Sequence, residues 1–274
     1  MQYILVPVKH PSKSQNTLKN AFVMAERLKM GVIVYHTMPL PTGFTHGSPL
    51  GGVYGSLEQR KKQVREELDR MIEQVPNSAD IAFETMISYG NISYGIKQIE
   101  SQNDIGLILM VSEGANGIMK SLWGTHASDV VKSVDSPVII LPPNTDISKM
   151  KTIALAGDYA EVTDPAVFEK LIEINSAFFA HMEIIHIHGD DFLEDDEIEV
   201  ARGLERYFKN VPHTFHFYQY NNVKEGLLAF CHENEVDLLA MIPRQHSLLE
   251  RLTQHSQTKK MIHDIPVPIL VLQD

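Results

Sequence analysis

NDIGLILMVSEG, residues 103–114, recurs in altered form as NEVDLLAMIPRQ at residues 234–245. The two stretches are offset by 234 − 103 = 131 residues, and the same offset relates PVIIL at 137–141 to PILVL at 268–272. Similarity at one fixed offset is the sequence signature of a duplicated unit. The 274-residue chain is therefore predicted to contain two copies of one unit of about 140 residues, an ordinary domain size.

Near the start of each copy the offset is larger. YILVPVK at 3–9 aligns with TIALAGD at 152–158, and IVYHT at 33–37 aligns with EIIHI at 183–187, an offset of 183 − 33 = 150. The difference, 150 − 131 = 19 residues, indicates extra sequence in the first copy, where PLPTGFTHGSPLGGVYGS occupies 39–56. Its glycine and proline content predicts an irregular, mobile loop. The predicted domains are 1–145 and 150–274.

Within each copy, short apolar runs alternate with amphipathic stretches. The first copy is expected to form strands near 2–8, 32–37, 81–88, 105–111 and 137–141, with helices over 14–28, 57–74, 92–101 and 125–134. The second is expected to form strands near 152–157, 183–188, 214–220, 237–242 and 268–272. This alternation predicts an α/β fold of two tandem doubly wound units, each an open five-stranded parallel sheet with helices on both faces. Ligands of such sheets bind at the carboxyl ends of the strands.

Bulk properties exclude several classes of protein. The net charge of 24 − 35 = −11 argues against nucleic-acid or anionic-membrane binding, because phosphates would be repelled. No apolar run approaches the roughly 20 residues of a membrane helix. The start, MQYILVPVKH, lacks a positive region before its short apolar stretch and is predicted to be a strand, not a signal peptide. The single cysteine, Cys231, permits no internal disulfide, and we expect a cytoplasmic protein.

The candidate metal ligands and nucleophiles in the sequence form no recognisable motif. His186 and His188 share one face of a predicted strand, and His213 and His216 lie around the next strand, but no short zinc-ligand spacing is present. The acidic run at 190–197 lacks the glycine and ligand order of a calcium loop. No serine or cysteine lies in a recognisable nucleophile motif. The sequence therefore predicts no metal site, no catalytic residue and no dedicated enzyme.

In this arrangement the chain resembles a tandem member of the universal stress protein family. The resemblance rests on an opening ILVPV strand, a second strand ending in an apolar residue and histidine, a fourth strand ending in methionine, and a final Pro-Val strand. The residues are Tyr35-His36 and Ile185-His186, Met110 and Met241, and Pro137-Val138 and Pro266-Val267. The resemblance implies the strand order 3-2-1-4-5, pairing of the two units near their last strands, and in many members ATP at the strand ends.

The family's nucleotide signature is a glycine, two residues, a glycine, nine residues, and a glycine followed by serine or threonine. In the first half Gly124-Thr125 forms the closing pair and Gly114 the second glycine, while Val111 stands at the first position. The resemblance implies that Gly114, Gly124 and Thr125 hold phosphates, with Mg²⁺ accompanying ATP. The backbones of Thr37 and Met110 would then contact adenine, and the 39–56 loop would close over the site.

Several residues depart from the signature. Val111 is branched, Glu113 adds negative charge near the phosphates, and Lys9 replaces the acidic residue that usually ends the first strand. In the second half Asp158 keeps that acidic position. The other signature positions there are Ile242, Gln245 and His255, with only Ser256 keeping the hydroxyl. ATP binding is therefore predicted for the amino-terminal half alone.

Two hypotheses stay open. In the first, the protein is a stress-linked regulatory module that binds ATP as a ligand, or hydrolyses it slowly as a switch. In the second, neither half binds nucleotide, and the chain is a dimerisation or interaction scaffold for an unidentified protein partner. Glu113, Val111 and Lys9 favour the second hypothesis slightly. Both include pairing of the two halves within the chain, and a homodimer of the whole chain is compatible with either.

Overall fold

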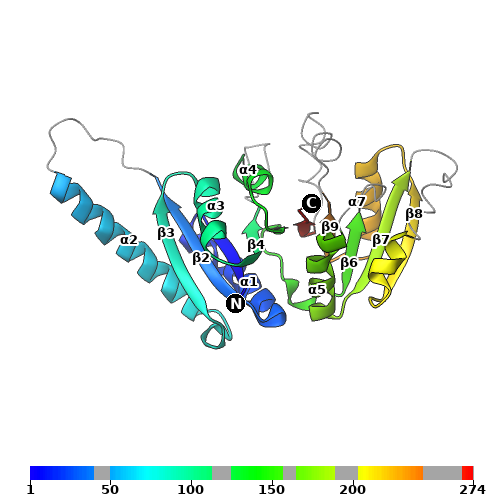
Figure 1. The fold of residues 1–274 in the computed structure, drawn as a ribbon, viewed down its shortest axis with the longest axis horizontal. Coiled ribbons are helices and arrows are strands. Elements are labelled where there is room, and N and C mark those ends of the chain that lie inside the picture. The colour runs from blue at the N-terminus through cyan, green and yellow to red at the C-terminus, as the bar shows by residue number, and fades with distance from the viewer. Residues whose placement is uncertain (40–49, 113–124, 157–164, 189–202, 243–266, 274) are drawn as a thin grey trace.

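A computed structural model shows one α/β assembly built around a single long sheet (Figure 1). The structure describes residues 1–39, 50–112, 125–156, 165–188, 203–242 and 267–273. Its ten strands lie in the order β3-β2-β1-β4-β5-β10-β9-β6-β7-β8. Read from its outer edge towards the junction, each half has the strand order 3-2-1-4-5.

The first half contains five strands and four α-helices among the described residues. The strands are β1 (Tyr3–Val8), β2 (Gly31–Met38), β3 (Phe83–Tyr89), β4 (Ile105–Val111) and β5 (Val138–Leu141). The helices are α1 (Gln15–Leu28), α2 (Leu50–Glu73), α3 (Ile92–Gln102) and α4 (Thr125–Ser133), with short 3₁₀ turns η1 (Pro11–Lys13), η2 (Ser78–Asp80) and η3 (Ile147–Lys149).

The second half repeats this order. Its strands are β6 (Thr152–Ala156), β7 (His181–His188), β8 (His213–Gln219), β9 (Leu238–Met241) and β10 (Ile269–Val271). Its helices include α5 (Glu169–Phe178), preceded by the 3₁₀ turn η5 (Pro165–Phe168), and α7 (Val223–Glu233); residues 203–208 are also helical.

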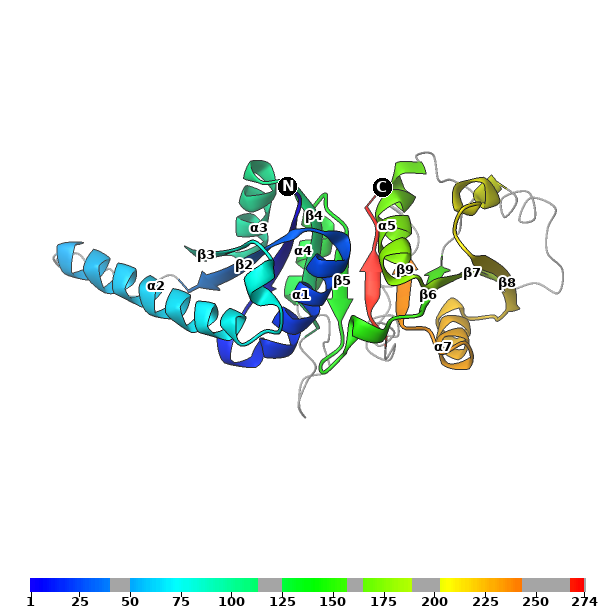
Figure 2. The same cartoon turned by 90° about the horizontal axis from the view of Figure 1, so that it is seen from below.

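The strands of each half are parallel, and the two halves meet at one antiparallel pair. β5 and β10 pair from Ile140↔Ile269 to Val138↔Val271, so the sheet continues from one half into the other. Figure 2 shows these two strands side by side at the centre of the molecule. Strands of the two halves run in opposite directions at this junction. Because the sheet twists along its length, the carboxyl ends of β2 and β7 still lie on the same side of the molecule in Figure 1.

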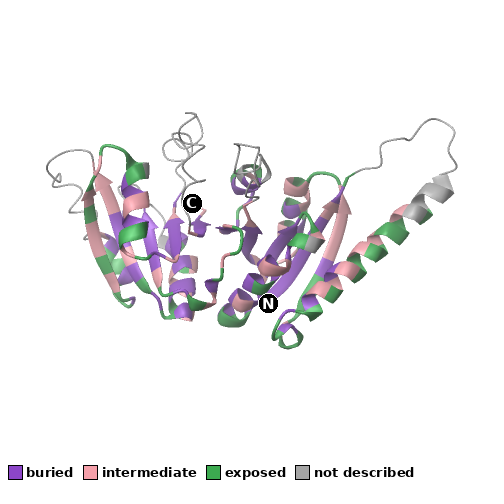
Figure 3. Ribbon diagram, turned by 180° about the vertical axis from the view of Figure 1, so that it is seen from behind, coloured by how far each residue is buried: buried purple, intermediate pink, exposed green. Residues whose placement is uncertain are grey.

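The core explains why the strands are nearly all apolar. In β4, Leu107 and Leu109 face a cluster that includes the α1 side chains Leu18 and Phe22, while Ile108 and Met110 face a second cluster on the other side of the sheet. Helices α1 and α2 cover the first face, and α3 and α4 cover the second. A strand buried on both faces has no place for a polar residue, which accounts for the run IGLILMV. Figure 3 shows buried residues concentrated in the strands.

One prediction about the first half is wrong. The stretch 39–56 was expected to be irregular throughout, but α2 begins at Leu50 and includes residues 50–56. Apolar residues at 50, 53, 57 and 64 keep a helical spacing that runs into the rest of α2, so propagation of an existing helix outweighs the cost of its glycines. Residues 40–49 lie outside the described part of the chain.

The described helices include none that is long and apolar enough to cross a membrane.

Cys231 is buried on α7, against the core that this helix shares with β6, β7 and β9. Burial raises the pKa of its thiol from 9.0 to about 12, because the apolar surroundings disfavour the thiolate. We expect no reaction of the folded protein with a thiol-specific disulfide reagent between pH 7 and about pH 9, since only the thiolate attacks. Unfolding in guanidinium chloride should expose one reactive thiol per chain. Rapid labelling of the native protein at neutral pH would contradict this placement.

Candidate functional site

The hydrogen-bond ladder between β1 and β4 ends early, which leaves an opening in the ladder on the side where the nucleotide site was predicted. β1 pairs with β2 along its whole length, up to Val8↔His36. Its pairing with β4 ends three residues earlier, at Leu5↔Ile108. The strand order also reverses here: β2 and β3 lie on one side of β1, whereas β4 and β5 lie on its other side. Such a switch point is where open α/β sheets form their ligand crevice.

Pro7 provides the physical reason for the opening. The backbone N–H of Tyr3 donates to the carbonyl of Asp104 (2.9 Å), so alternate residues of β1 direct their N–H groups towards β4. Continuing that alternation, Leu5 and then position 7 should donate. Proline has no N–H and cannot make the next bond of the ladder. Sequence reasoning used Pro7 only as part of the ILVPV motif and missed this consequence.

The second half lacks this opening within its described residues. The residue aligned with Pro7 is Ala156, at 156 − 7 = 149. β6 remains paired with β9 up to Ala156↔Met241, its last residue. The difference between proline and alanine thus accompanies a ladder that ends early at the switch point in the first half and one that continues in the second.

Two of the predicted site residues lie at the rims of this opening. Thr37 is half-buried and follows the last β1–β2 pair by one residue. Met110 follows the last β1–β4 pair by two residues, and its side chain is buried in the core on the α3–α4 face. The backbone of Met110 belongs to the ladder with β5, where it pairs with Ile140, so its N–H and C=O groups face β5 and not β1. Adjacent strands are about 4.8 Å apart, which places the two backbones roughly 10 Å from one another across β1.

The remaining predicted contacts are described only in part. Thr125 begins α4, as the sequence predicted. Gly114 and Gly124 lie outside the described residues, as does Glu113. Val111, which replaces the first signature glycine, is the last residue of β4 and is half-buried.

His36 supports the rim from beneath. Its imidazole is 7% exposed, and its Nδ1 donates to the carbonyl of Val8 at 2.6 Å. Because a carbonyl only accepts, Nδ1 carries the proton in this arrangement. The bond holds the end of β2 against the end of β1, beyond the last hydrogen-bonded pair of β1 and β4. The same position in the second half is His186, which lies beside Phe217 with ring centroids 6.3 Å apart.

Tyr35 anchors the other face of β2. Its ring is 2% exposed, and its hydroxyl lies 2.7 Å from the Ser88 hydroxyl on β3. Burial raises the pKa of the Tyr35 phenol, and the Ser88 hydrogen bond offsets part of that shift. Gly95 of α3 lies directly over the phenol, since a Cβ built there would fall 1.6 Å from its oxygen. Helix α3 can therefore lie this close to β2 only because Gly95 has no side chain.

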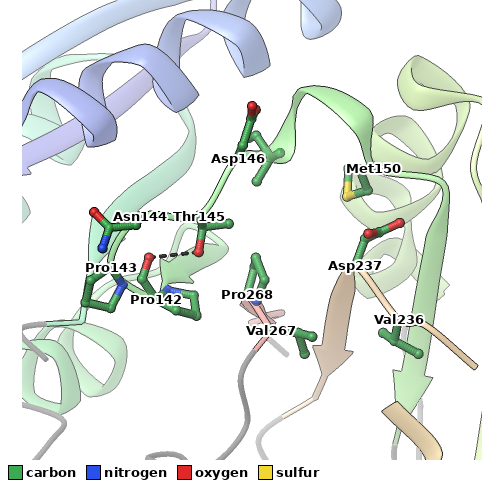
Figure 4. A pocket seen from close by; sticks show the side chains of 11 residues that line it. Pro142, Pro143, Asn144, Thr145, Asp146, Met150, Val236, Asp237, Val267 and Pro268 are labelled. Atoms are coloured by element: carbon green, nitrogen blue, oxygen red, sulfur yellow. Dashed lines mark hydrogen bonds between the residues drawn. The ribbon is translucent and has the colours of Figure 1, made fainter. Parts of the chain in front are cut away.

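A cavity of about 310 Å³ lies elsewhere, at the junction of the halves (Figure 4). Its lining comes from the linker after β5 and from the residues just before β9 and β10. The two carboxylates that line it already have partners. Asp237 accepts from the backbone N–H groups of Lys151 (2.7 Å) and Thr152 (3.0 Å), and Asp146 pairs with Lys19 (3.5 Å). We interpret the cavity as space left between the two halves where the linker turns.

The histidines do not converge. His186, His188 and His213 share one face of the β7–β8 pair, while His216 lies on the opposite face. His216 Nε2 is 2.6 Å from the Glu183 carboxylate, and His181 Nε2 is 2.8 Å from the Thr214 hydroxyl. No group of three or more potential ligands suited to a metal ion is present in the described ranges. The acidic run at 190–197 lies outside those ranges.

Comparison with known proteins establishes the family. The model of the universal stress protein family matches residues 1–142, more than half of the 274-residue chain, and the chain belongs to this family. Among curated proteins, none matches the sequence.

Solved structures agree in fold along the full length. A universal stress protein from Archaeoglobus fulgidus has a TM-score of 0.70 at 17% identity, covering 98% of this chain and 96% of that one. A protein described as a universal stress protein from Pseudomonas aeruginosa has a TM-score of 0.65 at 13% identity, with coverage of 100% and 93%. The cytoplasmic domain of a prokaryotic cation chloride cotransporter has a TM-score of 0.56 at 9% identity, with coverage of 99% and 95%. At these identities the likeness concerns the fold alone.

Proposed function

We propose that the protein is a regulatory, nucleotide-binding module of the stress response, whose amino-terminal half binds ATP with Mg²⁺ at the carboxyl ends of β1, β2 and β4. The observation that carries the proposal is the early end of the β1–β4 ladder after Leu5. It leaves Thr37 and Met110 beyond the last pairs that their strands make with β1, so a ligand bound here would lie between the ends of β2 and β4. The amino terminus of α4, which begins at Thr125, is the kind of helix end whose N–H groups and positive dipole end favour phosphates.

The polar groups described near the opening favour binding over catalysis. Ser112 follows β4, and its hydroxyl donates to the Leu141 carbonyl at 3.1 Å. The Nδ1 of His36 donates to the Val8 carbonyl, so this nitrogen is unable to accept a proton from a nucleophile. Within the described residues at this edge, no hydroxyl is paired with a general base. The proposed role is therefore ligand sensing without dedicated chemistry.

The proposal is tested by calorimetric titration of the purified full-length chain with ATP and Mg²⁺. We expect saturable heat at one site per chain and loss of that heat in Gly124→Glu, which places a carboxylate at the proposed phosphate loop.

A second variant, Pro7→Ala, restores the missing N–H donor. If β1 then pairs further with β4, a ladder hydrogen bond worth about 1 kcal/mol must break on binding, which lowers affinity by roughly fivefold.

The outcomes separate the two hypotheses. No heat from the wild-type chain at millimolar ATP would reject nucleotide binding and leave the interaction scaffold as the function. Heat that survives Gly124→Glu would reject the proposed location. Circular dichroism of each variant serves as the control for folding, because a misfolded variant would lose binding for another reason.

A further inference from the structure

The ten-stranded sheet has two edges, and they differ in how they are protected. β5 and β10 pair with each other and are flanked by β4 and β9, so the described sheet ends only at β3 and β8. An edge strand presents unpaired backbone groups that can bond another chain. Proteins usually protect such edges with charged residues, prolines, bulges or a covering helix.

The β3 edge is protected. Helix α2 is held against it by hydrogen bonds from Thr85 to the Asp69 carboxylate (2.7 Å) and from the Tyr89 hydroxyl to the Leu57 carbonyl (3.1 Å). The helix extends well past the edge of the sheet in Figure 2. β3 also carries the exposed charge of Glu84. A second chain approaching this edge would meet a charged helix and an acidic strand.

The β8 edge has none of these features among its described residues. Its sequence, HTFHFYQ, contains no lysine, arginine, acid or proline, and its pairing with β7 runs through seven residues without a register shift. Its side-chain hydrogen bonds run inwards: Thr214 and His216 bond to β7, and Tyr218 bonds to Glu233 of α7. Phe217 remains 37% exposed.

The backbone pattern shows which groups face outwards. Met182 N–H donates to the Pro212 carbonyl, and Tyr220 N–H donates to the His188 carbonyl, both at 3.0 Å. In a parallel ladder alternate residues bond the same neighbour, so the even-numbered residues of β8 bond β7. The N–H and C=O groups of His213, Phe215 and Phe217 therefore point away from the sheet, and no other described strand pairs with them.

We propose that β8 is a homodimer interface, at which two copies of the chain pair antiparallel about His216 to form a continuous twenty-stranded sheet. This register uses the whole strand and sets Phe215 of each copy opposite Phe217 of the other. Aromatic cross-strand pairs stabilise antiparallel sheets, and no like charges meet although each chain carries a net charge of −11. The symmetric contact closes on itself, so association stops at two chains.

The interface is tested by sedimentation equilibrium of the full chain over a micromolar concentration series. We expect a reversible monomer–dimer equilibrium in the wild-type protein. Phe217→Lys should weaken the dimer by at least roughly tenfold, because an ammonium replaces a ring in the aromatic pair. The matched control is Phe83→Lys, which alters a phenylalanine of similar exposure (40%) on the protected edge and should leave the dimer unchanged.

A crosslink tests the register. His216 lies on the proposed two-fold axis as a non-hydrogen-bonded pair, where Cα atoms approach to about 4.5 Å, within reach of a disulfide. His216→Cys should form an intermolecular disulfide under mild oxidation, and the buried Cys231 provides no competing thiol. A wild-type chain that stays monomeric at every concentration would overturn the interface. A dimer that resists Phe217→Lys and gives no crosslink would do the same.

Discussion

Gly95→Ala should cost the protein about 1 to 3 kcal/mol of unfolding free energy, although alanine is the better helix former. The added Cβ would lie 1.6 Å from the Tyr35 hydroxyl oxygen and 2.5 Å from its Cζ. Tyr35 is 2% exposed and bonded to Ser88, so its ring has no free space to move into. Overpacking of this kind costs about 1 to 3 kcal/mol, and displacing the phenol also breaks a hydrogen bond worth about 1 kcal/mol. The gain in helix propensity, about 1 kcal/mol, offsets only part of this.

Urea unfolding followed by circular dichroism measures the effect. The matched control is Gly55→Ala in α2, where a Cβ meets no atom within 4 Å and alanine should stabilise the helix slightly. Combining Gly95→Ala with Tyr35→Phe removes the atom nearest to the new Cβ. The double variant should therefore lose less than the sum of the two single variants. Equal stability of Gly95→Ala and Gly55→Ala would contradict the close contact between α3 and β2.

The fold could be predicted from sequence because its signals are local and repeated. β4 has the bounds that its apolar run predicts, and α4 begins at the predicted Thr125. A strand buried on both faces has a continuous apolar sequence, and a duplicated unit presents each signal twice. The start of α2 was misplaced because glycines at 51, 52 and 55 carry a strong turn signal that a neighbouring helix can outweigh.

The candidate site could be predicted only in outline. The family signature located the edge of the sheet and its possible contacts, Thr37, Met110 and the start of α4. The early end of the β1–β4 ladder was missed, because a proline interrupts only the ladder with the strand that its backbone nitrogen faces. That orientation follows from strand pairing, which a single sequence does not specify. Gly95 was missed for a similar reason, since Tyr35 lies 60 residues away in the chain, at 95 − 35 = 60.

Asn20→Leu should destabilise the protein by about 2 to 4 kcal/mol through the linker between the halves. Asn20 lies on α1, is 1% exposed, and uses its amide fully. Its Nδ2 donates to the carbonyls of Asn16 (2.9 Å) and Thr145 (2.8 Å), and its Oδ1 accepts from the backbone N–H of Ile147 (3.0 Å). Leucine has a similar shape but no polar atoms, so the buried N–H of Ile147 would lose its partner at the full cost of desolvation.

The expected phenotype is loosening of the junction as well as lower stability. Asn20 attaches the linker to the first half, while Asp237 attaches its far end to the second half through Lys151 and Thr152. Limited proteolysis should therefore cut Asn20→Leu between residues 142 and 151 faster than wild type. The matched control is Asn16→Leu, whose amide makes one bond, to the Thr145 carbonyl that Asn20 also contacts. If both variants lose equally little stability, then β5–β10 pairing, and not the Asn20 amide, holds the two halves together.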